Sequence, residues 1–274
     1  MGLRAFGVIV LGALAFLAWG YANSVRDPIV RRASFAFADW PAQAPPIRVA
    51  LISDPHLQGP DMPPARIARI AAQVAAQKPD LILLAGDFVG DRSLRTCDYS
   101  DAEIAAALRH FRAPLGTWAV LGNHDHWRDG PAMRRALKAV GIPVLDNRAV
   151  RIGPLTLAGA GDTHTENENI PALVRSVARL PGPTLLFAHS PDIIPRLPPR
   201  FGLVLAGHTH CGQIVLPLIG AITSASNYGD RYRCGVVREP GRITVIGAGL
   251  GTSVLPLRYG ALPDWWLVTL GPRS

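Results

Sequence analysis

The sequence predicts an α/β domain in which helices pack on a largely parallel sheet, preceded by one membrane-spanning helix. Short apolar runs alternate with amphipathic runs from residue 47 to about residue 188, and short strands separated by Gly turns follow from residue 203. An uncharged apolar stretch at the amino terminus predicts the membrane helix. We expect residues 1–24 to be an anchor or an uncleaved signal, 25–46 a linker and 47–274 the domain.

The amino-terminal stretch, residues 5–22, has 18 residues without a charge, which is just enough for a helix to cross a bilayer core of roughly 30 Å. Residues 20–22 are a poor small-x-small cleavage site, so we favour a retained anchor over a cleaved signal peptide. Arg4 precedes the stretch, and three arginines follow it: Arg26, Arg31 and Arg32. The positive-inside rule then weakly favours a domain on the cytoplasmic face.

The composition excludes several classes of protein. With 49% hydrophobic and 18% charged residues, the 274-residue chain is neither disordered nor low in core-forming side chains. Its 3 Cys residues are widely spaced, so we expect neither a disulfide scaffold nor a zinc ribbon. The net charge of +8 favours anionic partners such as phosphates or a membrane surface. Because no run of five basic residues occurs, we expect no nucleic-acid partner.

The predicted elements follow from the apolar spacing. Strands are expected at 34–38, 47–53, 80–85, 117–121, 155–160, 184–188, 203–206, 213–216, 232–237, 243–246 and 266–270. Helices are expected at 65–78, 102–111, 131–140 and 171–180. Pro64 suits the first turn of the first of these helices. The strand-rich tail predicts a second sheet packed against the first.

Polar side chains follow five of the predicted strands, where ligands of an open α/β sheet bind. The residues are Asp54 and His56, Asp87, the run Asn123-His124-Asp125, His189, and the pair His208 and His210. Five of the 8 His residues lie at these positions, which is not expected of structural histidines. Carboxylate and amide oxygens with imidazole nitrogens suit Mn, Fe or Zn, and at least seven candidate ligands are enough for two ions. The middle residue Asp87 is the natural bridge between them.

These five motifs resemble the full motif set of the calcineurin-like metallophosphoesterases, over about residue 47 to the end. The resemblance implies a four-layer α/β/β/α sandwich that hydrolyses phosphoesters with two divalent metal ions, Mn²⁺ first, with Fe or Zn as alternatives. It implies that Asp54, His56, Asp87 and His210 hold the first metal. It implies that Asp87, Asn123, His189 and His208 hold the second. His124 then acts as a catalytic group, with Asp125 orienting it.

A narrower resemblance is carried by the run from Gly207 to Ile214 with Gly249-Leu250-Gly251-Thr252-Ser253. These residues are similar to the membrane-anchored phosphodiesterase branch, which includes UDP-2,3-diacylglucosamine pyrophosphatase-like proteins of lipid A biosynthesis. This implies a membrane-associated phospholipid or nucleotide-linked lipid as substrate. Cys211 stands where that branch commonly has Gly, and we expect its thiol to point away from the metals. A monomer is expected.

The sequence gives less support to the remaining candidate site residues. Arg92 and Arg128 lie on loops beyond the ligand-bearing strands, so we expect them to bind substrate phosphate, with ordinary surface arginines as the alternative. His126 is a candidate for substrate binding or a surface-loop residue, and His164 follows another strand end with no assigned role.

Two alternatives to the lipid hydrolase remain: a phosphodiesterase of broad specificity on soluble substrates, and a metal-bound scaffold without activity. The scaffold is disfavoured because no ligand position is missing and His124 is present.

Overall fold

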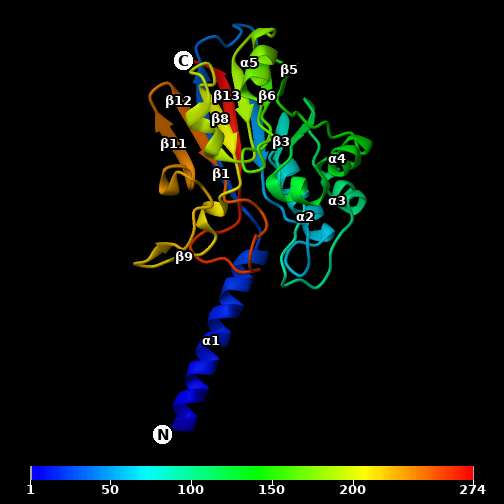
Figure 1. Cartoon of the computed structure of the whole chain (residues 1–274). Helices are drawn as coiled ribbons and strands as arrows, with labels where there is room; N and C mark the ends of the chain where they lie inside the picture. The colour runs from blue at the N-terminus through cyan, green and yellow to red at the C-terminus, as the bar shows by residue number, and fades with distance from the viewer. Residues whose placement is uncertain (1, 274) are drawn as a thin grey trace.

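The computed structural model describes residues 2–273, in which one long helix projects from an α/β body (Figure 1). This helix, α1 (Gly2–Val25), is the one helix among those residues that is long and apolar enough to cross a membrane. Within Arg4–Val25, a window of 18 residues has a mean hydropathy of 2.0, and only 6% of that window is buried. The expected apolar helix at the amino terminus is therefore present.

The first sheet has the strand order β1-β13-β2-β3-β4. Its strands are β1 (Ile29–Phe37), β2 (Ile47–Ile52), β3 (Leu81–Ala85), β4 (Thr117–Val120) and β13 (Asp264–Pro272). β1 runs parallel to β13 over its whole length, from Ile29 opposite Asp264 to Phe37 opposite Pro272. Much of the expected linker 25–46 is thus a full edge strand, longer than the strand predicted at 34–38.

The second sheet has the order β11-β12-β8-β7-β6-β5. Its strands are β5 (Arg148–Ile152), β6 (Leu155–Gly159), β7 (Thr184–Phe187), β8 (Leu203–Ala206), β11 (Gly235–Glu239) and β12 (Arg242–Ile246). A separate hairpin consists of β9 (Val215–Leu216) and β10 (Gly220–Ala221). The second sheet was predicted, but the last strand of the tail returns to the first sheet as β13.

Helices cover the outer face of each sheet, which gives the expected four layers (Figure 1). The first sheet carries α2 (Pro64–Ala76), α3 (Asp101–Leu108) and α4 (Asn123–Ala139), and the second carries α5 (Ile170–Ala178) and the short 3-10 helix η1 (Pro191–Arg196). Alternate residues of β2 show why: Val49 and Leu51 pack toward the second sheet, whereas Ala50 and Ile52 pack toward the helices. Both faces of the sheet are buried, so its strands are apolar throughout.

Candidate metal centre and active site

The structure brings all seven predicted metal ligands to one edge, beyond the carboxyl ends of parallel strands from both sheets. They follow β2 (Asp54, His56), β3 (Asp87), β4 (Asn123), β7 (His189) and β8 (His208, His210). All seven are buried. Asn123 lies on the first turn of α4, which begins eight residues before the helix predicted at 131–140 and is kinked at Asp129.

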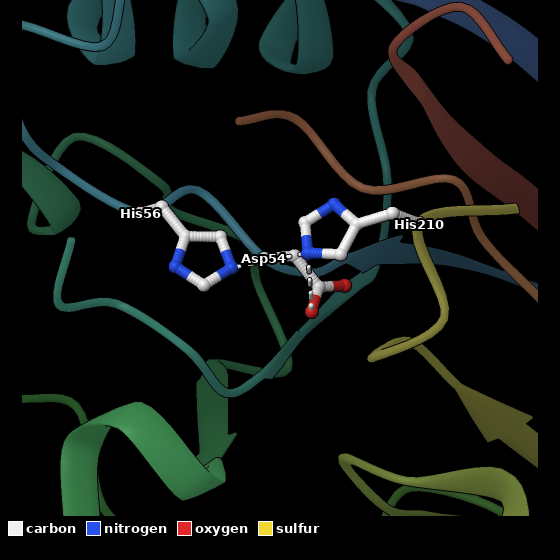
Figure 2. A group of neighbouring side chains, drawn as sticks. All are labelled: Asp54, His56 and His210. Atoms are coloured by element: carbon white, nitrogen blue, oxygen red, sulfur yellow. Dashed lines mark hydrogen bonds and ion pairs between the residues drawn. The ribbon is translucent and has the colours of Figure 1, made fainter. Parts of the chain in front are cut away.

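One group of ligands consists of Asp54, His56 and His210, whose donor atoms lie within 4.8 Å of one another. Figure 2 shows the imidazole of His210 lying beside the Asp54 carboxylate and the His56 imidazole, which belong to a distant segment of the chain. His56 Nε2 lies 3.1 Å from His210 Nε2, and His210 Nε2 lies 3.8 Å from Asp54 Oδ1. This arrangement is suited to one cation.

A second group surrounds His189. Its Nε2 lies 3.2 Å from Asp87 Oδ2, 3.0 Å from His208 Nδ1 and 3.1 Å from Asn123 Oδ1. The same Asp87 Oδ2 lies 3.6 Å from Nε2 of His56, which belongs to the first group. Asp87 therefore stands between the two groups, in the position of a bridging carboxylate.

The hydrogen bonds of two histidines test whether a cation fits. The Nδ1 atoms of His189 and His56 lie 2.8 Å and 3.0 Å from the carbonyl oxygens of Ala85 and Val89. A carbonyl only accepts, so each Nδ1 carries the hydrogen, and Nε2 of the neutral ring offers a lone pair. Those lone pairs point at the Asp87 carboxylate, so two hydrogen-bond acceptors face each other with no hydrogen between them. A divalent cation bound here would interact favourably with both the imidazole lone pairs and the carboxylate. Metal-bound histidines generally donate their other ring N–H to an acceptor, as these two do.

The electrostatics favour the ligating forms of most of these side chains. Burial lowers the pKa of His56 to about 4 and that of His208 to about 3, which keeps both rings neutral. Burial opposes ionisation of Asp87, but the charge and hydrogen bond of His189, with the charges of His124 and His56, together outweigh it and hold the pKa of Asp87 well below its usual range. Burial likewise lowers the pKa of His189, yet Asp87 holds it well above its ordinary value. Without metal, a proton on His189 thus takes the place of the cation.

The ligand backbones are strained. Asp54, His56, Asp87, His208 and His210 have φ values of 51°, 42°, 54°, 71° and 50°. This left-handed region is sparsely populated by residues other than Gly and costs about 1–3 kcal/mol each. Such strain is typical of functional sites, where the surrounding fold fixes the direction of each side chain.

Asp125 does not orient His124, contrary to our expectation. Its fully buried carboxylate accepts four backbone N–H groups at 2.8–3.1 Å, those of Asp87, Phe88, Val89 and Gly122. Asp125 therefore shapes the loop that carries the bridging residue. Burial raises the pKa of Asp125 to about 7, and the charge of Asp87 adds to this, whereas the N–H groups favour the ionised form.

The partner of His124 is Asp91, which sequence reasoning missed. Asp91 Oδ1 lies 2.7 Å from His124 Nδ1, and the backbone N–H of His124 donates to Asp87 Oδ1 at 3.0 Å. Burial lowers the pKa of His124, but Asp91 and Asp87 outweigh it and raise the pKa above its ordinary value. The only sequence signal was that Asp91 lies four residues after Asp87 on the same loop.

Arg92 is buried and does not line the cavity beside the candidate ligands. Its buried guanidinium forms an ion pair with Asp61 and donates to Gln58 Oε1 and Thr252 Oγ1 at 3.1 and 2.6 Å. These contacts join two loops in the interior. A buried guanidinium needs such partners, because burying an unpaired charge is costly. Sequence alone does not separate this role from phosphate binding.

The other weaker candidates lie nearer the site. Arg128 is exposed and paired with Asp101 at 3.2 Å, in a shallow cavity that His124 also lines. The exposed Trp127 ring lies between the rings of His124 and His164, at 4.8 and 5.6 Å.

His126 is half-buried, and burial lowers its pKa. The exposed His164 lies with its ring centroid 5.4 Å from that of His208, so it belongs to the rim of the site.

Cys211 forms a disulfide with Cys234, a pairing that the sequence analysis did not foresee. Its neighbour His210 is a candidate ligand, so the bond restrains the ligand loop. The structure has this single disulfide among the described residues rather than a disulfide scaffold, and Cys97 is a free, exposed thiol.

A cavity of about 360 Å³ opens beside the metal ligands. Asp87, His124, His208 and His210 are among the residues that line it. The remainder of the wall is mostly apolar and includes Ile214, Ile222, Val254 and Leu255. The cavity thus combines polar side chains that suit a phosphate with aliphatic side chains that suit another part of the same molecule.

Known proteins resemble the chain closely enough to place it. Residues 47–212 match the family model described as calcineurin-like phosphoesterase. A Bacillus subtilis protein named uncharacterized metallophosphoesterase YkuE is 28% identical, over 97% of this chain and 94% of its own length. Phosphodiesterase YaeI of Escherichia coli is 35% identical over 83% of each chain. A Danio rerio protein, transmembrane protein with metallophosphoesterase domain, is 27% identical over 93% of this chain and 60% of its own length. With the clustered Asp and His ligands, these matches establish that the chain belongs to the calcineurin-like phosphoesterase family and is a phosphoester hydrolase.

Proposed function

We propose that the chain is a phosphodiesterase, dependent on two divalent cations, whose substrate is a phosphate-containing lipid of the membrane that holds α1. The cavity is the observation that supports a lipid: candidate metal ligands and His124 line it together with aliphatic side chains. A small soluble diester needs only the polar residues. Burial of an acyl chain against aliphatic side chains is favourable at about 25 cal/mol per Å² of apolar surface.

Two ions are proposed because the donor atoms form two groups, and Asp87 of the second group lies 3.6 Å from Nε2 of His56 in the first. The first is held by Asp54, His56 and His210, and the second by His189, His208 and Asn123. Oxygen and imidazole donors suit Mn²⁺, with Fe or Zn as alternatives. When bound, such ions lower the pKa of water and polarise the phosphoryl oxygens.

His124 is proposed as the acid that protonates the leaving oxygen. Its side chain is 14% exposed and lines the cavity, with Nε2 3.9 Å from Asp87 Oδ2. Asp91 fixes the ring through Nδ1, so Nε2 is the nitrogen that faces the reacting phosphate. The raised pKa favours the protonated form that a general acid needs.

The side of the membrane bears on which lipid is hydrolysed. UDP-2,3-diacylglucosamine requires a cytoplasmic site, which the arginines after α1 favour. The Cys211–Cys234 bond favours an oxidising compartment instead. Arg31 also forms an ion pair with the buried Asp264, so its charge serves the fold. We therefore propose the outer face, and protease digestion of sealed right-side-out membrane vesicles tests it. A domain protected from protease would restore the nucleotide-linked lipid as the candidate.

Hydrolysis by the full chain in proteoliposomes tests the function. The samples contain Mn²⁺, and the substrates are vesicle-borne phosphatidylglycerol, UDP-2,3-diacylglucosamine and the soluble diester bis-para-nitrophenyl phosphate. We expect hydrolysis of a lipid substrate that chelator abolishes and that Asp87→Asn lacks. Hydrolysis of the soluble diester alone would favour the broad-specificity enzyme. No hydrolysis by a metal-loaded sample would favour the scaffold.

A further inference from the structure

The hairpin of β9 and β10 exposes aliphatic side chains on the face of the domain from which α1 departs. Leu218 is fully exposed and Ile219 is 70% exposed. Ile222, at the end of the hairpin, is 59% exposed, and Val254, which lines the same cavity as Ile222, is 76% exposed. Leu218 also has a φ of 65°, a conformation that Gly adopts more readily. Clustered exposed aliphatic side chains of this kind mark an interaction surface.

The anchor helix docks on the neighbouring loop. The Tyr259 ring stacks on Phe16 of α1 with centroids 4.3 Å apart, and its hydroxyl donates to the Phe16 carbonyl at 2.7 Å. The Arg258 N–H donates to the Gly20 carbonyl at 3.0 Å. A side chain at Gly20 would collide with the Tyr259 ring, so this close approach requires glycine. The domain is therefore held at the level of residues 16–20 of the helix.

The same tyrosine ties the hairpin to the helix. The Val215 N–H, at the start of β9, donates to the Tyr259 carbonyl at 2.8 Å. Figure 1 shows the hairpin, labelled β9, at the end of the body where α1 leaves it. The depth of the hairpin relative to the membrane is thus set by the depth of α1.

The length of the free helix fixes that depth. Arg4 bounds the uncharged stretch of the helix, and the part of it that precedes the first docked residue, 5–15, spans only about 16 Å as an α-helix. A bilayer core is roughly 30 Å thick. This apolar part alone does not cross the core, so residues 16–20 must lie within the near leaflet. The loops that pack on them lie there too.

We propose that the hairpin 215–222 inserts into the near leaflet of the bilayer and that lipid enters the active site directly from that leaflet. The second clause rests on the function proposed above. Ile222 and Val254 are both exposed and part of the cavity wall, so this aliphatic part of the wall faces the membrane. A lipid can then keep its acyl chain in apolar surroundings while its phosphate reaches His208 and His210.

Depth-dependent quenching tests insertion without any activity assay. The full chain with Cys97→Ser carries an environment-sensitive fluorophore on Leu218→Cys, and a matched sample carries it on Val236→Cys. Val236 is an exposed aliphatic residue of β11, away from α1 (Figure 1). In phosphatidylcholine–phosphatidylglycerol vesicles we expect a blue shift and quenching by nitroxide lipids at position 218, and neither at 236. A label at 218 that remains unquenched would overturn the proposal.

A second pair of variants tests entry of lipid. Leu218→Glu with Ile219→Glu should lower the hydrolysis of vesicle-borne lipid while leaving the rate on bis-para-nitrophenyl phosphate and the melting temperature unchanged. Val236→Glu should change none of them. Equal lipid hydrolysis by the double variant and the native chain would refute entry from the leaflet. If the native chain hydrolysed neither substrate, the proposed function would fail, whereas the quenching result would still decide whether the hairpin inserts.

Discussion

Replacing Asp125 by Asn should destabilise the domain severely, although the two side chains have nearly the same shape. The carboxylate accepts N–H groups on both oxygens, two from Gly122 and Asp87 on Oδ2 and two from Phe88 and Val89 on Oδ1. In Asn one oxygen remains and the other position becomes an amide donor facing two N–H groups. Hydrogen bonds to a charged group contribute about 1.5–3 kcal/mol each, so losing two costs about 3–6 kcal/mol. A domain of this size then melts roughly 10–20 °C lower.

Thermal unfolding in chelator, at a pH above the raised pKa of Asp125, measures this without a contribution from metal. Asp129→Asn is the matched control on the same helix, because Asp129 is exposed and accepts a single N–H bond from Ala132 at 2.8 Å. Asn makes that bond equally well, so the control should stay within about 0.5 kcal/mol of the native chain. Equal melting temperatures for the two variants would refute the role assigned to Asp125.

Three further outcomes are expected. His124→Ala should lower kcat by about 10²–10⁴ at unchanged metal content, because it removes a proton donor and no ligand; an unchanged kcat would exclude the role of acid. Asp91→Asn should lower the pKa of His124, so the pH at which activity falls on the alkaline side should move down, and an unshifted pH profile would leave Asp91 a purely structural role. Cys234→Ser should cost about 3 kcal/mol by opening a loop of 23 residues, seen as a lower melting temperature that Cys97→Ser does not share.

The fold and the ligand set were largely predictable because both depend on patterns local in sequence. Buried strands such as β2 and β3 are short apolar runs, and a ligand follows each directly. A parallel sheet brings such strand ends together whatever the loops between them do. Polar residues at strand ends therefore carried enough information to predict that all seven candidate ligands lie together.

The features that the sequence did not predict correctly depend on contacts between distant segments. The sequence predicts only the second half of β1, within the expected linker, because the pairing of β1 with β13 joins residues more than 230 positions apart. Arg92 contacts Thr252 across 160 residues, and nothing local distinguishes it from an exposed arginine. Asp125 and Asp91 are both acidic residues near His124, and only the geometry shows which one contacts the ring.

The segment after β8 contains two candidate metal ligands, is restrained by the disulfide and leads into the hairpin that we propose inserts into the membrane. His208, His210, Cys211 and Gln213 all have φ between 49° and 71°, so four of six successive residues are in a strained conformation. Such a segment keeps one shape only when both its ends are fixed. β8 fixes the first end, and the Cys211–Cys234 bond, with the Gln213 amide donating to the carbonyls of residues 255 and 257, fixes the second. Residue 215 then begins the hairpin. The restraints that hold the ligands in place therefore also hold the hairpin at a fixed depth, and loosening them should disturb metal binding before the two sheets separate.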